Sequence, residues 1–131
     1  MYYLEGYWIL ALMVLFHIIV DFHTQGILAS MKQKKWWADN VPAMGFTHKY
    51  DKDYLAALFM HSVEWSIVVH IPFVVFYCSN PVVLASVVFN AFAHMFIDDL
   101  KCNRMKINLI TDQTLHIIQI VASVLIMDCI V

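Results

Sequence analysis

The fold of this chain follows most directly from residues 81–100, which read PVVLASVVFNAFAHMFIDDL. The stretch is predominantly apolar and has the length of about 20 residues that a helix needs to cross a membrane. It begins with Pro81, which suits the first turn of a helix because its missing N–H would have no partner there. Near its end, His94 and Asp98 lie four positions apart, on one face of a helix. We therefore expect a transmembrane helix with a polar pair on one side.

Three further stretches have the same character, and the four together predict an all-α fold, a four-transmembrane-helix bundle in a single domain, 1–131. The composition agrees with this class, because 62% of the residues are hydrophobic and 14% are charged, whereas soluble domains are about 45–50% apolar and about 25% charged. Pro72 predicts a kink in the second span, and Asn108 or Thr111 is the expected cap of the fourth. The predicted spans are 4–30, 54–78, 81–100 and 109–131.

All 8 basic residues lie in two of the connections between spans, which predicts an orientation. The first connection carries Lys32, Lys34, Lys35, Lys49 and Lys52, and the second carries Lys101, Arg104 and Lys106. The positive-inside rule places both connections in the cytoplasm and both termini on the outer side. Within the first connection, the charged and Trp-containing stretch 32–39 predicts a short helix at the membrane surface. The net charge of -2 gives no footprint for nucleic acid.

Each predicted span carries a pair of one histidine and one carboxylate three or four residues apart. The pairs are His17/Asp21, His61/Glu64, His94/Asp98 and Asp112/His116. Residues three or four apart share a helix face, so each span presents a nitrogen and an oxygen ligand together. With the predicted orientation, all four pairs fall at one depth near the inner leaflet. We therefore expect them to converge on one polar site inside the bundle.

A metal centre is the leading interpretation of this site. Charged groups inside a membrane are costly and need compensation, which metal ligation would supply. Imidazole with carboxylate suits a divalent metal, above all Zn²⁺, with Mn²⁺ and Fe²⁺ as alternatives. Eight ligands suffice for one or two ions. Three amides extend the same stripes, either as hydrogen-bonding partners of the ligands or as ordinary interhelical contacts: Gln25, Asn90 and Gln119.

Two residues near the site and one remote histidine complete the prediction. Lys101 and Arg104 flank the inner mouth, where they either set the topology or attract an anionic headgroup or phosphate. His70 lies off the face of His61, in the outer half of its span, and is interpreted as a packing residue.

The motifs resemble an uncharacterised family of small integral-membrane proteins of bacteria and their phages. The resemblance is carried by HIIVDFHTQ (17–25), by HMFIDDLKCN (94–103) and by DQTLH (112–116). A more distant similarity is to the membrane-bound, metal-dependent hydrolases of the LexA regulon, which carry H-x-x-x-D pairs on helices. The His61/Glu64 spacing of three departs from that pattern. The resemblance implies a multi-pass protein of the bacterial inner membrane, of host or phage origin, and supplies no substrate.

Three functions remain open at this point. The first is a metal-dependent hydrolase that attacks an ester or phosphoester of a lipid at the cytoplasmic leaflet, with Glu64, Asp98 or Asp112 as catalytic base. The second is a small proton- or ion-coupled transporter, a class that often works as a homo-oligomer. The third is a non-enzymatic membrane module whose metal or polar network only stabilises the fold.

Overall fold

The structure is a computed structural model that describes residues 2–41, 49–77 and 80–130, without the side chains of residues 2–5. All of its regular elements are helical, which confirms the all-α class. In chain order they are α1 (Tyr2–Ile19), a π-helical turn η1 (Val20–Thr24), α2 (Leu28–Met31), α3 (Lys34–Asn40), α4 (Asp53–Val69), α5 (Ile71–Tyr77), α6 (Pro81–Cys102) and α7 (Leu109–Ile130).

Three helical stretches are long and apolar enough to cross a membrane. They are Gly6–Thr24, Pro81–Cys102 and Leu109–Ile130. Helices α4 and α5 meet the same criteria as a pair bent by 43°. The bend lies at the predicted kink, because Pro72 in the first turn of α5 has no N–H to continue the hydrogen-bond ladder of α4.

Local signals set the helix starts much as predicted. Asn80 caps α6 by accepting a hydrogen bond from the backbone N–H of Val82 at 2.9 Å, with Pro81 in the first turn. Asn108 caps α7 by accepting from the N–H of Thr111 at 2.9 Å. Of the two caps predicted for α7, the structure therefore selects Asn108.

The first predicted span is shorter than expected. Its helix ends at Thr24, and Gly26 follows with a φ of +51°. This left-handed conformation stops a right-handed helix and is available to glycine without a steric penalty. The chain then forms the short helix α2 and, after it, α3 at Lys34–Asn40, close to the helix predicted around 32–39.

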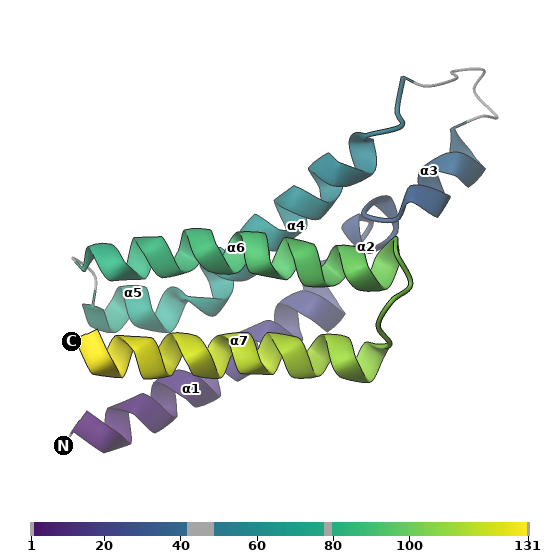
Figure 1. Cartoon of the computed structure of the whole chain (residues 1–131). Coiled ribbons are helices and arrows are strands. Elements are labelled where there is room, and N and C mark those ends of the chain that lie inside the picture. The colour runs from purple at the N-terminus through teal and green to yellow at the C-terminus, as the bar shows by residue number, and fades with distance from the viewer. Residues whose placement is uncertain (1, 42–48, 78–79, 131) are drawn as a thin grey trace.

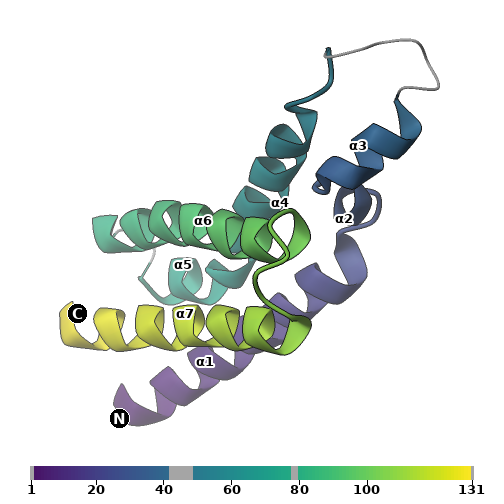
Figure 2. The same ribbon diagram turned by 45° about the vertical axis from the view of Figure 1, so that its right-hand side comes forward.

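The helices pack so that the two ends of the molecule differ. Helices α6 and α7 run antiparallel and side by side, α4 packs against α6, and α1 crosses obliquely to contact α7 and α4 (Figure 1). Both chain ends lie at one end of this arrangement, whereas α2, α3 and the α6–α7 connection lie at the other (Figures 1 and 2). The basic segments are thus separated from the termini by the length of α6 and α7.

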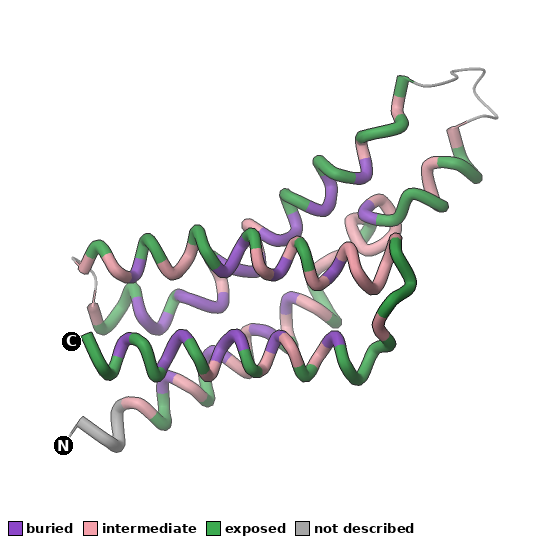
Figure 3. The backbone as a smooth tube through the Cα atoms, viewed as in Figure 1, coloured by how far each residue is buried: buried purple, intermediate pink, exposed green. Residues whose placement is uncertain are grey.

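The surface is apolar and much of the interior is polar. Large hydrophobic side chains on α6, such as Leu84, Phe89 and Phe92, are at least 60% exposed, which would be exceptional on a soluble protein and suits a lipid environment. The buried positions lie on the faces that the helices turn toward one another (Figure 3). Toward the chain ends, these positions form an apolar cluster that includes Ile9, Met13, Phe73, Val83 and Met127. Toward the opposite end, the interior is occupied by histidines and carboxylates.

Candidate metal centre

Four helical segments deliver the polar side chains to one place. The turn η1 carries Asp21, α4 carries His61, α6 carries His94 and Asp98, and α7 carries Asp112 and His116. We call these six residues the ligand cluster. Asp21 lies in the π-helical turn, a geometry that is rare in proteins and recurs at functional sites.

The first part of the ligand cluster is built on His61, His94 and Asp98. The Nε2 atoms of His61 and His94 lie 3.2 Å apart, and Asp98 Oδ2 lies 3.6 Å from the first and 3.7 Å from the second. Asp21 Oδ1, from η1, lies 3.5 Å from His61 Nε2 and 3.9 Å from His94 Nε2. Each of the two imidazole nitrogens therefore lies within 3.9 Å of a carboxylate oxygen of Asp98 and of Asp21.

The second part shares Asp98 with the first. His116 Nε2 lies 3.4 Å from Asp98 Oδ1 and 3.5 Å from Asp112 Oδ1. The two oxygens of Asp98 thus face different imidazoles, with Oδ1 toward His116 and Oδ2 toward His61 and His94. The ring of His94 stacks on that of His116, with centroids 4.1 Å apart, which holds the two parts against each other.

The donor atoms of the ligand cluster lie at separations that a bound metal ion could bridge. Asp21 Oδ1, Asp112 Oδ1 and His116 Nε2 are buried and have no hydrogen-bond partner. Ligands held about 2.0–2.1 Å from a tetrahedral zinc ion would be about 3.3–3.4 Å apart, close to the separations of 3.2–3.7 Å around His61, His94 and Asp98. Three groups have ligand atoms within 4.8 Å of one another: Asp21/His94/His116, His61/His94/Asp98 and Asp98/Asp112/His116. Buried His/Asp groups that could hold a metal ion are thus present.

His17 lies beside the ligand cluster and has hydrogen-bond partners of its own, and its role as a metal ligand stays a prediction. Its Nδ1 accepts a hydrogen bond from Trp65 Nε1 at 2.9 Å, and its Nε2 donates to Gln113 Oε1 at 3.1 Å. Both ring nitrogens are thereby engaged. Gln113 in turn donates to Asp112 Oδ2 at 3.0 Å and to Asp21 Oδ2 at 3.3 Å. The sequence spacing identified His17 but missed Trp65, which donates to its ring, and Gln113, which connects it to the carboxylates of Asp21 and Asp112.

Glu64 is the other predicted ligand that does not join. It is half-buried on α4 and belongs to none of the three ligand groups found among the described residues. A spacing of three residues places Glu64 about 60° around α4 from His61, because each residue turns the helix by about 100°. Its role as a metal ligand or catalytic base stays a prediction.

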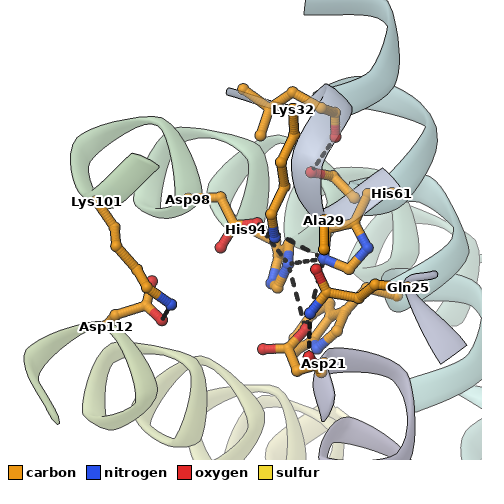
Figure 4. A network of polar contacts seen from close by, with 12 residues as sticks. Asp21, Gln25, Ala29, Lys32, His61, His94, Asp98, Lys101 and Asp112 are labelled. Carbon is orange, nitrogen blue, oxygen red and sulfur yellow. Dashed lines mark hydrogen bonds and ion pairs between the residues drawn. The ribbon is translucent and has the colours of Figure 1, made fainter. Parts of the chain in front are cut away.

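Two lysines enter the site, and only one of them was expected nearby. Lys32 is buried, and its Nζ lies 2.6 Å from Asp98 Oδ2. Lys101 Nζ lies 2.7 Å from Asp112 Oδ2. Figure 4 shows Lys32 reaching from α2 toward Asp98 and His94, with the Lys101–Asp112 pair beside them. No local signal points to Lys32, because the helix ends at Thr24 and the turn at Gly26 interrupts the helical spacing before Lys32.

Two of the predicted accessory amides belong to a second polar cluster farther into the bundle, composed of His70, Ser86, Asn90, Gln119 and Ser123. His70 Nε2 lies 2.9 Å from Ser86 Oγ, and Asn90 Nδ2 donates to Ser123 Oγ at 2.9 Å. Gln119 Nε2 donates to the carbonyl of Asn90 at 2.8 Å. These are interhelical hydrogen bonds of the ordinary kind in membrane bundles. The third amide, Gln25, donates to the carbonyl of Asp21 and so acts on the backbone of the π-helical turn.

Comparisons with family models, with curated proteins and with solved structures give no match to this chain. The argument for function therefore rests on the geometry of the ligand cluster.

Proposed function

We propose that this protein crosses the membrane four times and binds a divalent metal ion in its interior, held by His61, His94 and Asp98 with Asp21 opposite. The observation that carries the proposal is the set of lone pairs that face one another at 3.2–3.9 Å in a buried site. Two imidazoles with two carboxylates favour Zn²⁺, with Mn²⁺ and Fe²⁺ as the alternatives.

The arrangement of the helices supports the predicted orientation. Counting the bent α4–α5 pair as one span gives an even number of crossings, which agrees with both chain ends lying at the same end of the molecule. Lys32 after α2, the lysines of α3, Lys101 near the end of α6 and the basic residues of the α6–α7 connection lie toward the opposite end. We place that end in the cytoplasm by the positive-inside rule, so the ligand cluster lies at the level of the inner leaflet.

The chemistry that we assign to the site is hydrolysis of an ester or phosphoester of a membrane lipid. A divalent ion, when bound, polarises such a bond and makes water more acidic. Asp112 is the residue best placed to take a proton, because its Oδ1 has no hydrogen-bond partner while its Oδ2 is held by Lys101 and Gln113. Asp98 acts as a ligand instead, since its Oδ2 faces His61 and His94, the two imidazoles of the proposed centre. The apolar outer surface of the helices lets a lipid approach sideways.

The interior argues against a path across the membrane. Between the second polar cluster and the chain ends, the described interior is filled by apolar side chains, including Met13, Phe73 and Met127. A proton or ion pathway needs polar groups or water along its whole length. The polar groups instead concentrate toward one end, which favours a site served from the cytoplasmic side over a transporter.

A structural polar network is the second candidate, favoured by the two lysine–carboxylate pairs. Lys32 with Asp98 and Lys101 with Asp112 compensate two of the buried carboxylates without any metal. In this alternative, the cluster only stabilises the bundle.

Elemental analysis of the detergent-purified protein separates the two candidates. A metal centre predicts stoichiometric zinc, manganese or iron that is lost in His61→Gln and retained in His70→Gln, a buried histidine outside the ligand cluster. A structural network predicts no stoichiometric metal in any of these proteins.

The hydrolytic step has its own test. Phospholipid in mixed micelles is incubated with the metal-loaded protein, and the products are followed by ³¹P NMR. Asp112→Asn should keep its metal and its fold but lose turnover. Glu64→Gln should keep its metal, its fold and its turnover. Turnover is compared with protein abundance in three variants, Glu64→Gln, Asp98→Asn and Asp112→Asn. If turnover falls only in proportion to protein abundance in all three, the catalytic assignment is removed.

A further inference from the structure

The ammonium groups of Lys32 and Lys101 inside a proposed cation site need an explanation. A lysine beside a metal ion opposes metal binding by charge repulsion. Both lysines nevertheless point at carboxylates of the ligand cluster, Lys32 at Asp98 and Lys101 at Asp112. They flank His116, whose Nε2 lies between the same two carboxylates.

The position of Lys32 is fixed by the fold. Asn103, in the α6–α7 connection, donates from Nδ2 to the carbonyl of Lys32 at 3.1 Å and accepts at Oδ1 from the N–H of Lys34 at 2.8 Å. Asn103 is itself held by Asp99 at 3.0 Å. The backbone that follows the Lys32 side chain is therefore tied to Asn103 at the end of α6, and the Lys32 side chain is directed into the bundle and buried.

The formal charge of the site shows what these lysines would do. Asp21, Asp98 and Asp112 contribute three negative charges, Lys32 and Lys101 contribute two positive charges, and histidines that ligate a metal are neutral. The sum is one negative charge. One divalent ion turns it into one positive charge, and a second ion would raise it further. Because an uncompensated charge is expensive in a buried site, an anion would stabilise the loaded centre.

We propose that the metal-loaded centre binds a phosphate group between the metal, Lys32 and Lys101. This inference rests on the proposed function and adds the class of substrate to it. Lysine is a common phosphate ligand because its ammonium is a compact charge that accepts many oxygen geometries. A phosphate has enough oxygens to contact a metal and two ammonium groups at once, whereas a carboxylate has two. Lys101 is the accessible partner, with its side chain 30% exposed, and Lys32 is the buried one, at 7%.

The phosphate can belong to a lipid headgroup or be free in solution, and the experiment separates these sources. Full-length protein in detergent is loaded with zinc, freed of excess metal, and titrated calorimetrically with inorganic phosphate, with a short-chain phosphatidic acid and with acetate. We expect phosphate and phosphatidic acid to bind and acetate to bind at least roughly tenfold more weakly, because it lacks the additional charge-assisted hydrogen bond. Tighter binding of phosphatidic acid than of inorganic phosphate assigns the site to a lipid headgroup, and equal binding assigns it to free phosphate.

Lysine variants test the role of the two ammonium groups. Lys32→Met and Lys101→Met should each weaken phosphate binding roughly tenfold or more, whereas Lys106→Met, at an exposed lysine of the same connection, should leave it unchanged. Zinc content and unfolding are measured for every variant. Lys101→Met keeps the test decisive if Lys32→Met does not fold, because Lys101 lies at the edge of the site.

The failures of the two proposals look different. Three outcomes overturn this inference and leave the metal centre standing. They are stoichiometric zinc without phosphate binding, phosphate binding that is unchanged in both lysine variants, and acetate binding as tight as phosphate binding. The absence of stoichiometric zinc, manganese and iron overturns the proposed function and this inference together.

Discussion

Replacing His94 by glutamine is the sharpest test of the metal centre. His94 is fully buried, and its Nε2 faces His61 Nε2 at 3.2 Å. Its ring stacks on Trp65 and on His116, with centroids 4.2 Å and 4.1 Å away. The substitution therefore removes a metal ligand and two ring contacts, and the two effects are separable because only the first depends on metal.

The size of each effect can be estimated. At a zinc concentration about 100 times the dissociation constant, binding stabilises the wild type by about 2.7 kcal/mol, and an affinity about 100-fold weaker reduces this to about 0.4 kcal/mol. The lost ring contacts cost roughly 0.5–1.5 kcal/mol each, whether or not zinc is present. Equilibrium unfolding in detergent, with zinc and with a chelator, measures both. We expect the zinc-dependent part of the unfolding free energy to fall by about 2 kcal/mol.

His70→Gln is the matched control. His70 is buried to 1% exposure, like His94, but its hydrogen bonds go to Ser66 and Ser86 in the second polar cluster. This variant should lose the same free energy with and without zinc. The reasoning is refuted if the unfolding free energy of the wild type does not depend on zinc, or if His70→Gln loses the zinc-dependent part as fully as His94→Gln does.

Three further results are expected. Gly26→Ala should destabilise the protein by about 1–2 kcal/mol in denaturant titrations, because Gly26 has a φ of +51°. Gly6→Ala should instead be neutral or stabilising by up to about 1 kcal/mol in the same titrations, since its new Cβ would lie at an ordinary 3.6 Å from Asp128 and alanine favours helix. Destabilisation of both variants by equal amounts would contradict the role of the left-handed turn. A cysteine introduced at Lys35, on a background without native cysteines, should react with an impermeant reagent only from the cytoplasmic side, and one at Asp128 only from the outside; labelling of Lys35→Cys in intact cells would reverse the orientation.

The fold class and the members of the ligand cluster, as candidates, could be predicted from the sequence, because helical periodicity is a local property. Long apolar stretches have few alternatives to membrane helices, and a spacing of four residues places His94 with Asp98 and Asp112 with His116 on single faces. Proline signals were equally reliable: Pro72 lies at the 43° bend and Pro81 in the first turn of α6.

The tertiary structure decided which of these side chains face one another. His17 has the spacing of a ligand, but Trp65 and Gln113, on two other helices, engage both of its nitrogens. Glu64 has an allowed spacing, yet the rotation of α4 that directs His61 inward turns Glu64 aside. Such rotations depend on how neighbouring helices pack, which no single stretch of sequence specifies.

Lys32 shows the same division most plainly. By itself the sequence determined that a lysine follows the first span. In a basic connection, such a residue is expected to set the orientation of the chain in the membrane. Only the folded chain shows that Gly26 turns the backbone, that Asn103 ties the backbone carbonyl of Lys32, and that the ammonium consequently reaches Asp98 inside the bundle. These contacts join residues that are 66 and 71 positions apart in the sequence. Long-range contacts of this kind follow from packing and not from local pattern.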